Sequence, residues 1–113
     1  MSTIFSKIIN KEITANIVYE DDDVLAFDDV VPQAPVHILI IPKKAIKTVN
    51  DINIKDASII GKLFLIAKNL AKEKNIDQDG YRLVMNCNEY GGQSVYHIHL
   101  HLIGGRRLGW SPG

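Results

Sequence analysis

Residues 95–103 read Val95-Tyr96-His97-Ile98-His99-Leu100-His101-Leu102-Ile103. Polar and apolar side chains alternate from His97 onward, which is the pattern of a β-strand that buries one face. The three histidines would therefore share one face, each about 6.6–7 Å along the strand from the next. The apolar residues between and after them would enter the core from the other face: Ile98, Leu100 and Leu102. This stretch predicts a rigid strand that presents a row of imidazoles.

The segments that precede this strand predict a mixed α+β domain. A capping-box pattern at Asn53–Asp56 and apolar residues at helical spacing predict one long helix to about Asn75. Ser2 or Thr3 would cap a short helix at the N-terminus. Alternating or strongly apolar runs predict four more strands, at residues 16–20, 24–27, 36–41 and 81–87.

Two connections in this arrangement are expected to be loops. Residues 28–35 contain two prolines, which exclude a helix or a central strand there. Residues 88–94 contain Gly91 and Gly92 and lead into the histidine strand. The acidic run Glu20–Asp23 fits a solvated hairpin turn better than a metal site. We therefore expect a single domain, 1–113, with an antiparallel sheet of about five strands, one long helix and a short N-terminal helix.

Composition limits the classes of function. The chain has 113 residues, 13 basic and 13 acidic side chains, and 46% hydrophobic residues. A net charge near zero argues against binding to bulk nucleic acid or to an anionic membrane, but not against a small nucleotide ligand.

The single cysteine, Cys87, cannot form an internal disulfide, and no apolar run is long enough to span a membrane. The first seven residues lack the apolar region of a signal peptide. We expect a cytoplasmic protein whose size would also permit entry into a nucleus.

The histidine row has three interpretations. Packing alone explains three alternating histidines poorly. A metal site could use the row with His37 as a fourth ligand, but the pattern lacks the cysteine or carboxylate partners and the spacings of common structural zinc sites. In the third interpretation an imidazole nitrogen attacks an electrophilic phosphorus while neighbouring donors neutralise the charge on its oxygens. The loop Gly91-Gly92-Gln93-Ser94 favours this last interpretation, because its backbone can approach a phosphate closely.

The stretch from His97 to Ile103 resembles the His-φ-His-φ-His-φ-φ signature (φ, apolar) of the histidine triad (HIT) family of nucleotide hydrolases and transferases. Further segments are similar to the Hint branch of that family, so the likeness covers essentially the whole chain. These segments are Phe5–Ile9, Asp29–His37, Ile41–Lys44, Gly91–Tyr96, Gly104–Arg106 and Trp110–Gly113.

The resemblance implies a role for each candidate site residue. His99 would be the nucleophile and carry a transient adenylate, while His97 would orient the site and His101 would contact the α-phosphate. His37 would be the fourth site histidine, and Ser94 would lie near the leaving amine. The remaining nucleotide contacts would be Asp29 at the ribose hydroxyls with Val30 beside it, Asn86, Gly92 and Gln93 at the phosphate, Leu100 within the triad, and Phe5, Ile8, Ile13 and Phe27 in an apolar slot for the base.

The resemblance also implies an activity and an assembly. Hint proteins are homodimers that cleave the P–N bond of adenosine 5′-monophosphoramidate-like substrates, so we expect a purine nucleoside phosphoramidase with an AMP-like ligand and no metal or other cofactor. Exposed apolar residues on the long helix and on the strand at 81–87 would suit a dimer. The alternatives are a dinucleoside polyphosphate hydrolase or nucleotidyl transferase of the same family, a nucleotide-binding interaction protein, and a metal-binding protein. Ser111 stands where the family's C-terminal Trp-Pro-Pro-Gly motif has a proline, which bears on leaving-group preference. Tyr90 is less typical of animal members and would alter the rim of the site.

Overall fold

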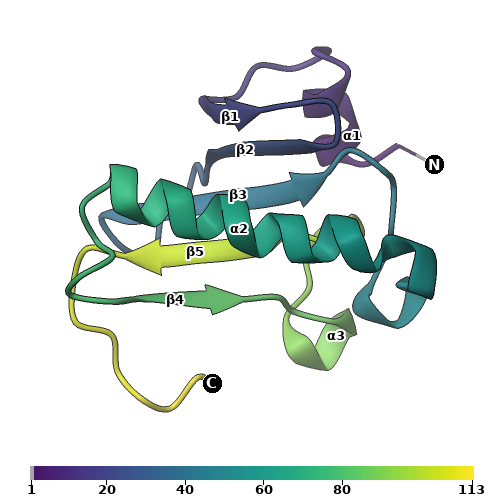
Figure 1. Ribbon diagram of the computed structural model, residues 1–113. Helices are drawn as coiled ribbons and strands as arrows, with labels where there is room; N and C mark the ends of the chain where they lie inside the picture. The colour runs from purple at the N-terminus through teal and green to yellow at the C-terminus, as the bar shows by residue number, and fades with distance from the viewer. Residues whose placement is uncertain (1) are drawn as a thin grey trace.

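The computed structural model describes residues 2–113. A five-stranded sheet has the order β1-β2-β3-β5-β4, and every neighbouring pair is antiparallel (Figure 1). The strands are β1 (Ile17–Glu20), β2 (Val24–Asp28), β3 (Val36–Pro42), β4 (Tyr81–Val84) and β5 (Leu100–Gly104). The helices are α1 (Ile4–Ile9), α2 (Ala57–Glu73) and the one-turn α3 (Asn88–Gly91), with 3₁₀ turns at Val49–Asp51 and Ile54–Asp56. The predicted α+β class, the antiparallel sheet and the two main helices are confirmed.

The long helix α2 lies across one face of the sheet, along β3 and β5 (Figure 1). Its apolar residues Leu63 and Leu70 pack against Ile38 and Ile40 of β3 and against Leu100, all almost completely buried. The capping box at its start is confirmed, since Asn53 and Asp56 exchange side-chain to backbone hydrogen bonds. It closes a 3₁₀ turn, and the α-helix begins one residue later, at Ala57.

The other face of the sheet carries a second apolar cluster. Phe5 and Ile8 of α1 pack there against alternate residues of β2 and β3, because strand side chains point to opposite faces in turn. Thr3 caps α1 in a capping box with Ser6. The chain therefore has a helix on each side of the sheet, and the face under α1 is the one to which the histidines belong.

The predicted strand at 95–103 is only partly correct, because β5 begins at Leu100. The register pairs Ile40 with Leu100, so continuing the ladder by two residues would set Ile98 opposite Pro42. Pro42 has no N–H to donate, and the N–H of Ile98 bonds to the carbonyl of Ile46 at 2.8 Å. Residues 95–99 are therefore irregular, and His97 and His99 precede the strand instead of lying in it.

Two further boundaries differ from the prediction. The strand expected at 81–87 ends at Val84, and the loop expected at 88–94 contains the turn of helix α3. Gly92 closes this turn with a φ of +86°, a left-handed conformation that glycine adopts without a Cβ clash. The loop expected at 28–35 is confirmed, except that Asp28 still pairs with β3.

The acidic hairpin turn at Glu20–Asp23 is an ion-pair cluster. Lys11 and Lys43 contact Glu20 at 2.7 and 2.8 Å, and Lys62 of α2 contacts Asp21 at 2.8 Å. Lysine amines thus neutralise the turn and tie it to α2, which fits a structural role for the turn.

The contact between α2 and the sheet should dominate the stability of the fold. Leu63→Ala removes a fully buried side chain, and we expect it to lower the free energy of unfolding by about 2–5 kcal/mol. Ile54→Ala is the control, because Ile54 is 89% exposed and its loss should cost no more than about 0.5 kcal/mol. Urea denaturation measures both, and equal effects of the two variants would contradict this description of the core.

Candidate functional site

Four histidines meet on the face of the sheet that points away from α2. His37 comes from β3 and His101 from β5, while His97 and His99 come from the segment that leads into β5. His99 and His101 have ring centroids 4.9 Å apart, and those of His37 and His101 are 5.2 Å apart. The predicted clustering of these four side chains on one face is therefore present in the structure.

Backbone carbonyls determine the proton positions on two of the rings. Nδ1 of His99 lies 2.8 Å from the carbonyl oxygen of His97, and Nε2 of His97 lies 2.7 Å from the carbonyl oxygen of Pro42. A carbonyl can only accept, so each of these nitrogens must carry the proton. In the neutral ring of His99 the other nitrogen, Nε2, is left with a free lone pair.

Burial keeps these rings neutral. His97 and His99 are 2% and 6% exposed, and burial lowers the pKa of both below the usual histidine value. Phe5 of α1 contributes to this burial, because its ring meets that of His99 edge to face at a centroid distance of 5.0 Å. His99 consequently holds a desolvated, unprotonated Nε2 at neutral pH.

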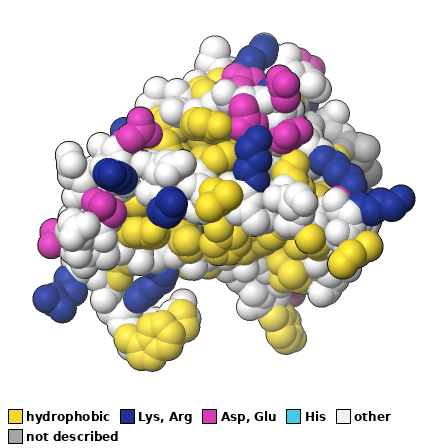
Figure 2. Space-filling model, viewed as in Figure 1, with side chains coloured by type: hydrophobic (Ala, Val, Ile, Leu, Met, Phe, Trp, Pro, Cys, Tyr) yellow, Lys and Arg dark blue, Asp and Glu magenta, His cyan; other side chains and the backbone are white. Residues whose placement is uncertain are grey.

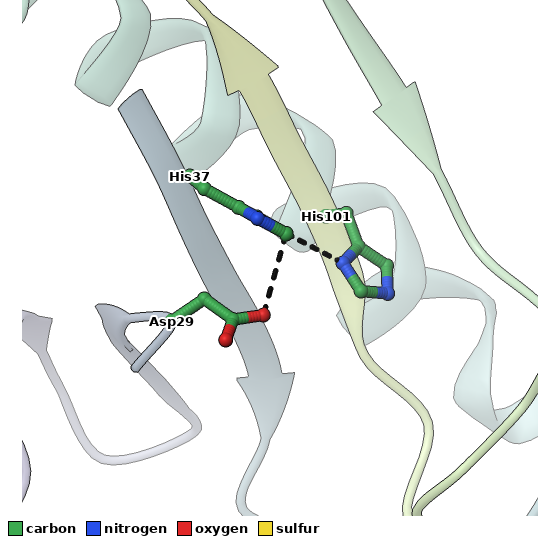
Figure 3. A group of neighbouring side chains, drawn as sticks. All are labelled: Asp29, His37 and His101. Carbon is green, nitrogen blue, oxygen red and sulfur yellow. Dashed lines mark hydrogen bonds and ion pairs between the residues drawn. The ribbon is translucent and has the colours of Figure 1, made fainter. Parts of the chain in front are cut away.

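The other two histidines form a directed hydrogen-bond chain. The backbone N–H of Gln33 donates to Nδ1 of His37 at 3.1 Å, so the proton of that ring is on Nε2. Nε2 of His37 lies 2.9 Å from Nδ1 of His101 and donates to it (Figure 3). His101 must therefore carry its own proton on Nε2.

Nε2 of His101 is a buried donor with no hydrogen-bond partner among residues 2–113. An unpaired buried N–H is costly, and one beside the free lone pair of His99 is a candidate contact for an oxygen of a ligand. Burial, together with neighbouring His99 and His37, lowers the pKa of His101 to about 4. The site thus sets a lone pair on His99 beside an N–H on His101, which suits attack on a phosphorus whose oxygen accepts that N–H.

Asp29 lies at the edge of this group. One carboxylate oxygen accepts the backbone N–H of Val31 at 2.9 Å, and the other is 3.5 Å from Nε2 of His37 (Figure 3). A cavity of about 250 Å³ opens beside Asp29 and His37. The carboxylate retains acceptor capacity toward this cavity, which suits hydroxyl groups of a ligand.

Asp29, His37 and His101 could also be considered as metal ligands, since one donor atom from each lies within 4.8 Å of the others. A metal ion would need the lone pair of Nε2 of His37, but that atom carries the proton because Nδ1 accepts from Gln33. Coordination would require moving the proton to Nδ1 and breaking the bond to Gln33. The group fits a hydrogen-bond chain better than a metal ion.

The glycine-containing loop at residues 88–94 offers mainly backbone groups to a ligand. The side-chain amide of Gln93 is buried and donates to the carbonyls of Lys47 and Val95 at 2.7 and 3.1 Å, while its oxygen accepts the N–H of Asn88 at 2.9 Å. These bonds occupy the Gln93 side chain and tie the loop to the segment that carries Lys47. Ser94 is exposed and Asn86 half-buried, so both hydroxyl and amide are accessible to a ligand.

The residues expected around the base occupy different environments. Phe5, Ile8 and Phe27 are buried in the apolar cluster under α1, whereas Ile13 is 37% exposed and Val30 is 92% exposed on its loop. Leu100 is 1% exposed and packs in the core beneath α2, so only its backbone faces the histidine side. Sequence patterns do not reveal the contribution of Pro42, Gln33 and Lys47, because each acts through a main-chain atom.

Comparisons with known proteins show the family and the fold of the chain. The HIT domain family model matches residues 10–108. The purine nucleoside phosphoramidase of Escherichia coli (strain K12) is 56% identical over 107 residues, covering 95% of this chain and 90% of that protein. The crystal structure of a HIT family hydrolase from Legionella pneumophila superimposes with a TM-score of 0.97 at 52% identity, covering 99% of this chain and all of that one. A histidine triad protein from Clostridium difficile gives a TM-score of 0.93 at 46% identity, covering 96% and 95% of the two chains.

The hydrogen bonds predict the tautomer of every histidine in the chain. In nitrogen-15 correlation spectra recorded above neutral pH, His37, His97 and His101 should show the Nε2–H tautomer. His99 alone should show Nδ1–H, because its partner is the carbonyl of His97. An Nδ1–H tautomer at His37 or His101 would contradict the hydrogen-bond chain from Gln33.

Proposed function

Since this chain belongs to the HIT domain family, we propose that it is a purine nucleoside phosphoramidase that hydrolyses the P–N bond of adenosine 5′-monophosphoramidate-type substrates. The observation that carries the proposal is the pair formed by the free Nε2 lone pair of His99 and the unpartnered Nε2–H of His101. Such a pair supplies a nucleophile and an oxygen-binding donor without a metal ion.

In the first step, Nε2 of His99 forms a bond to the α-phosphorus and the P–N bond to the leaving amine breaks. The His99 ring gains positive charge, which its Nδ1–H shares with the carbonyl of His97. The leaving amine takes up a proton from solvent through the exposed hydroxyl of Ser94, which we place beside it. The N–H of His101 stabilises the negative charge on a non-bridging oxygen.

In the second step, a water oxygen bonds to phosphorus, the bond to Nε2 of His99 breaks, and the nucleoside monophosphate is released. The proton that the water loses balances the proton taken up by the amine, so the net reaction consumes one water. Burial lowers the pKa of His99, which favours return of the ring to the neutral form that can attack again.

We propose that the nucleotide is bound by the residues that the resemblance to the family implies. We place the ribose hydroxyls on Asp29 with Val30 beside them, and the phosphate against the Gly92–Ser94 loop with Asn86. Phe5, Ile8 and Phe27 would form the floor of the base slot, and Ile13 its accessible edge. Because the side chain of Gln93 is already bonded to Asn88 and Lys47, the contact of Gln93 with phosphate would come from its backbone.

His99→Ala should reduce hydrolysis of an adenosine phosphoramidate by about three orders of magnitude or more, because the attacking nitrogen is lost. Rapid acid quenching of the wild-type enzyme followed by mass spectrometry should locate an adenylate on His99. Circular dichroism of the variant provides the control for folding. Turnover near the wild-type rate in His99→Ala would refute the covalent route, and faster cleavage of diadenosine triphosphate than of the phosphoramidate would refute the substrate class.

We further propose that the protein works as a homodimer in the cytoplasm. No helix within the described residues is long and apolar enough to cross a membrane. The strand β4 lies at an edge of the sheet, and α2 leaves Phe64 and Leu65 46% and 58% exposed. Figure 2 shows hydrophobic side chains gathered in a band across the face that α2 covers. Exposed apolar surface of this kind suits burial against a second copy.

Light scattering should therefore give a mass of about twice the 12.6 kDa of one chain. Leu65→Glu should shift the protein toward the monomer, because it places a charge in the proposed interface. Ile54→Glu introduces the same charge at an exposed position outside this surface and should leave the mass unchanged. A wild-type mass of one chain at micromolar concentration would overturn the proposed dimer.

A further inference from the structure

The turn that follows β5 packs directly on the loop that carries Asp29. Gly105 has a φ of +93°, and a Cβ built on it would lie 2.9 Å from a side-chain atom of Pro35. The next residue, Arg106, is exposed, yet its guanidinium donates to the carbonyl of Gln33 at 2.9 Å and to that of Arg107 at 3.1 Å. The two segments are therefore in contact at both Pro35 and Gln33.

Gln33 is the residue whose backbone N–H sets the proton position on His37. The side-chain amide of Gln33 donates only to the carbonyl of Val31, which lies within the same loop. Among residues 2–113, Arg106 is thus the only group outside the loop, apart from His37 itself, that forms a hydrogen bond with Gln33. The guanidinium of Arg106 offers donors only, so it holds the carbonyl of Gln33 in one orientation.

Four hydrogen-bonded residues consequently connect the protein surface to the site. They run from Arg106 through Gln33 to His37 and then to His101, with distances of 2.9, 3.1 and 2.9 Å. The guanidinium of Arg106 restrains the carbonyl of Gln33, and through the shared Cα it restrains the neighbouring peptide plane, whose N–H donates to His37. Without that N–H, only the Asp29 carboxylate, 3.5 Å from Nε2, would still favour a proton on Nε2, and part of the His37 population could move its proton to Nδ1. His37 would then present a lone pair to Nδ1 of His101, and His101 could no longer keep its proton on Nε2 while accepting from His37.

We propose that Arg106 is a positioning residue that keeps His101 in the tautomer that donates to the substrate oxygen. The inference rests on the proposed function for the role of that N–H, but the tautomer itself is a property of the free protein. Arg106 touches neither substrate nor reacting atoms in this scheme. It acts through Gln33 and His37.

The test uses three variants at neighbouring positions. Arg106→Met keeps an apolar stem of similar reach and removes the donors, whereas Arg106→Lys retains one charged donor. Arg107→Met is the matched control, because it removes the same charge from the adjacent exposed position and leaves the bond from Arg106 to Gln33 in place. Thermal unfolding establishes that all three variants are folded.

Nitrogen-15 spectra of the histidines are the deciding readout. Arg106→Met should convert the single Nε2–H signature of His37 and His101 into a mixture of tautomers, while Arg106→Lys and Arg107→Met should keep the wild-type signature. With a phosphoramidate substrate, Arg106→Met should lower kcat by about 3- to 10-fold, the value of one hydrogen bond, with a smaller change in KM. Arg106→Lys and Arg107→Met, which keep the wild-type tautomers, should keep kcat near the wild-type value.

Unchanged tautomers in Arg106→Met would overturn the proposal whatever the activity of the variant. An equal loss of kcat in Arg107→Met would also overturn it, because general loss of positive charge would then explain the effect. Failure of the proposed function is a separate outcome, since the wild-type protein would then leave the phosphoramidate intact while its histidine tautomers still responded to Arg106.

Discussion

The pairing of β3 with β5 is the constraint on which the rest of the structure depends. Its register sets Leu39 opposite His101 and Ile38 opposite Leu102. Because strand residues alternate between faces, burying Ile38, Ile40, Leu100 and Leu102 under α2 forces His37 and His101 to the other face. The same apolar packing that stabilises the domain therefore brings the two histidines within hydrogen-bond distance. If β5 slipped by one residue in this pairing, His101 would turn toward α2 and away from His37.

Main-chain groups then specify the chemistry of the four rings. The carbonyls of Pro42 and His97 and the N–H of Gln33 are fixed acceptors and donors, and each dictates where one imidazole carries its proton. Burial complements them, because it lowers the pKa of all four histidines and keeps the rings neutral. Among the side chains that these interactions involve, only that of Asp29 is a carboxylate.

The sequence predicts the architecture well, because periodic burial is a local property. The alternation around His101 and the helical spacing from Ile59 to Ala71 both correspond to elements of the structure. The start of β5 could not be predicted, since it depends on Pro42, a partner more than fifty residues away that lacks an N–H. The same holds for the site: the pattern identifies the histidines, but their tautomers depend on backbone atoms that no side-chain pattern encodes. The buried bonds of Gln93 are a further example, because its partner Lys47 contributes only a carbonyl.

The hydrogen bond to Nδ1 of His37 comes from the main chain of Gln33 and not from its side chain. Position 33 contributes to the histidine chain through an N–H and a carbonyl that every residue except proline possesses in full. Its side chain is thus free to diverge, although it lies four residues from a ring on which the chemistry depends. Substitutions at position 33 should be tolerated whatever the size or polarity of the new side chain. Proline is the exception, because it lacks the N–H that donates to His37.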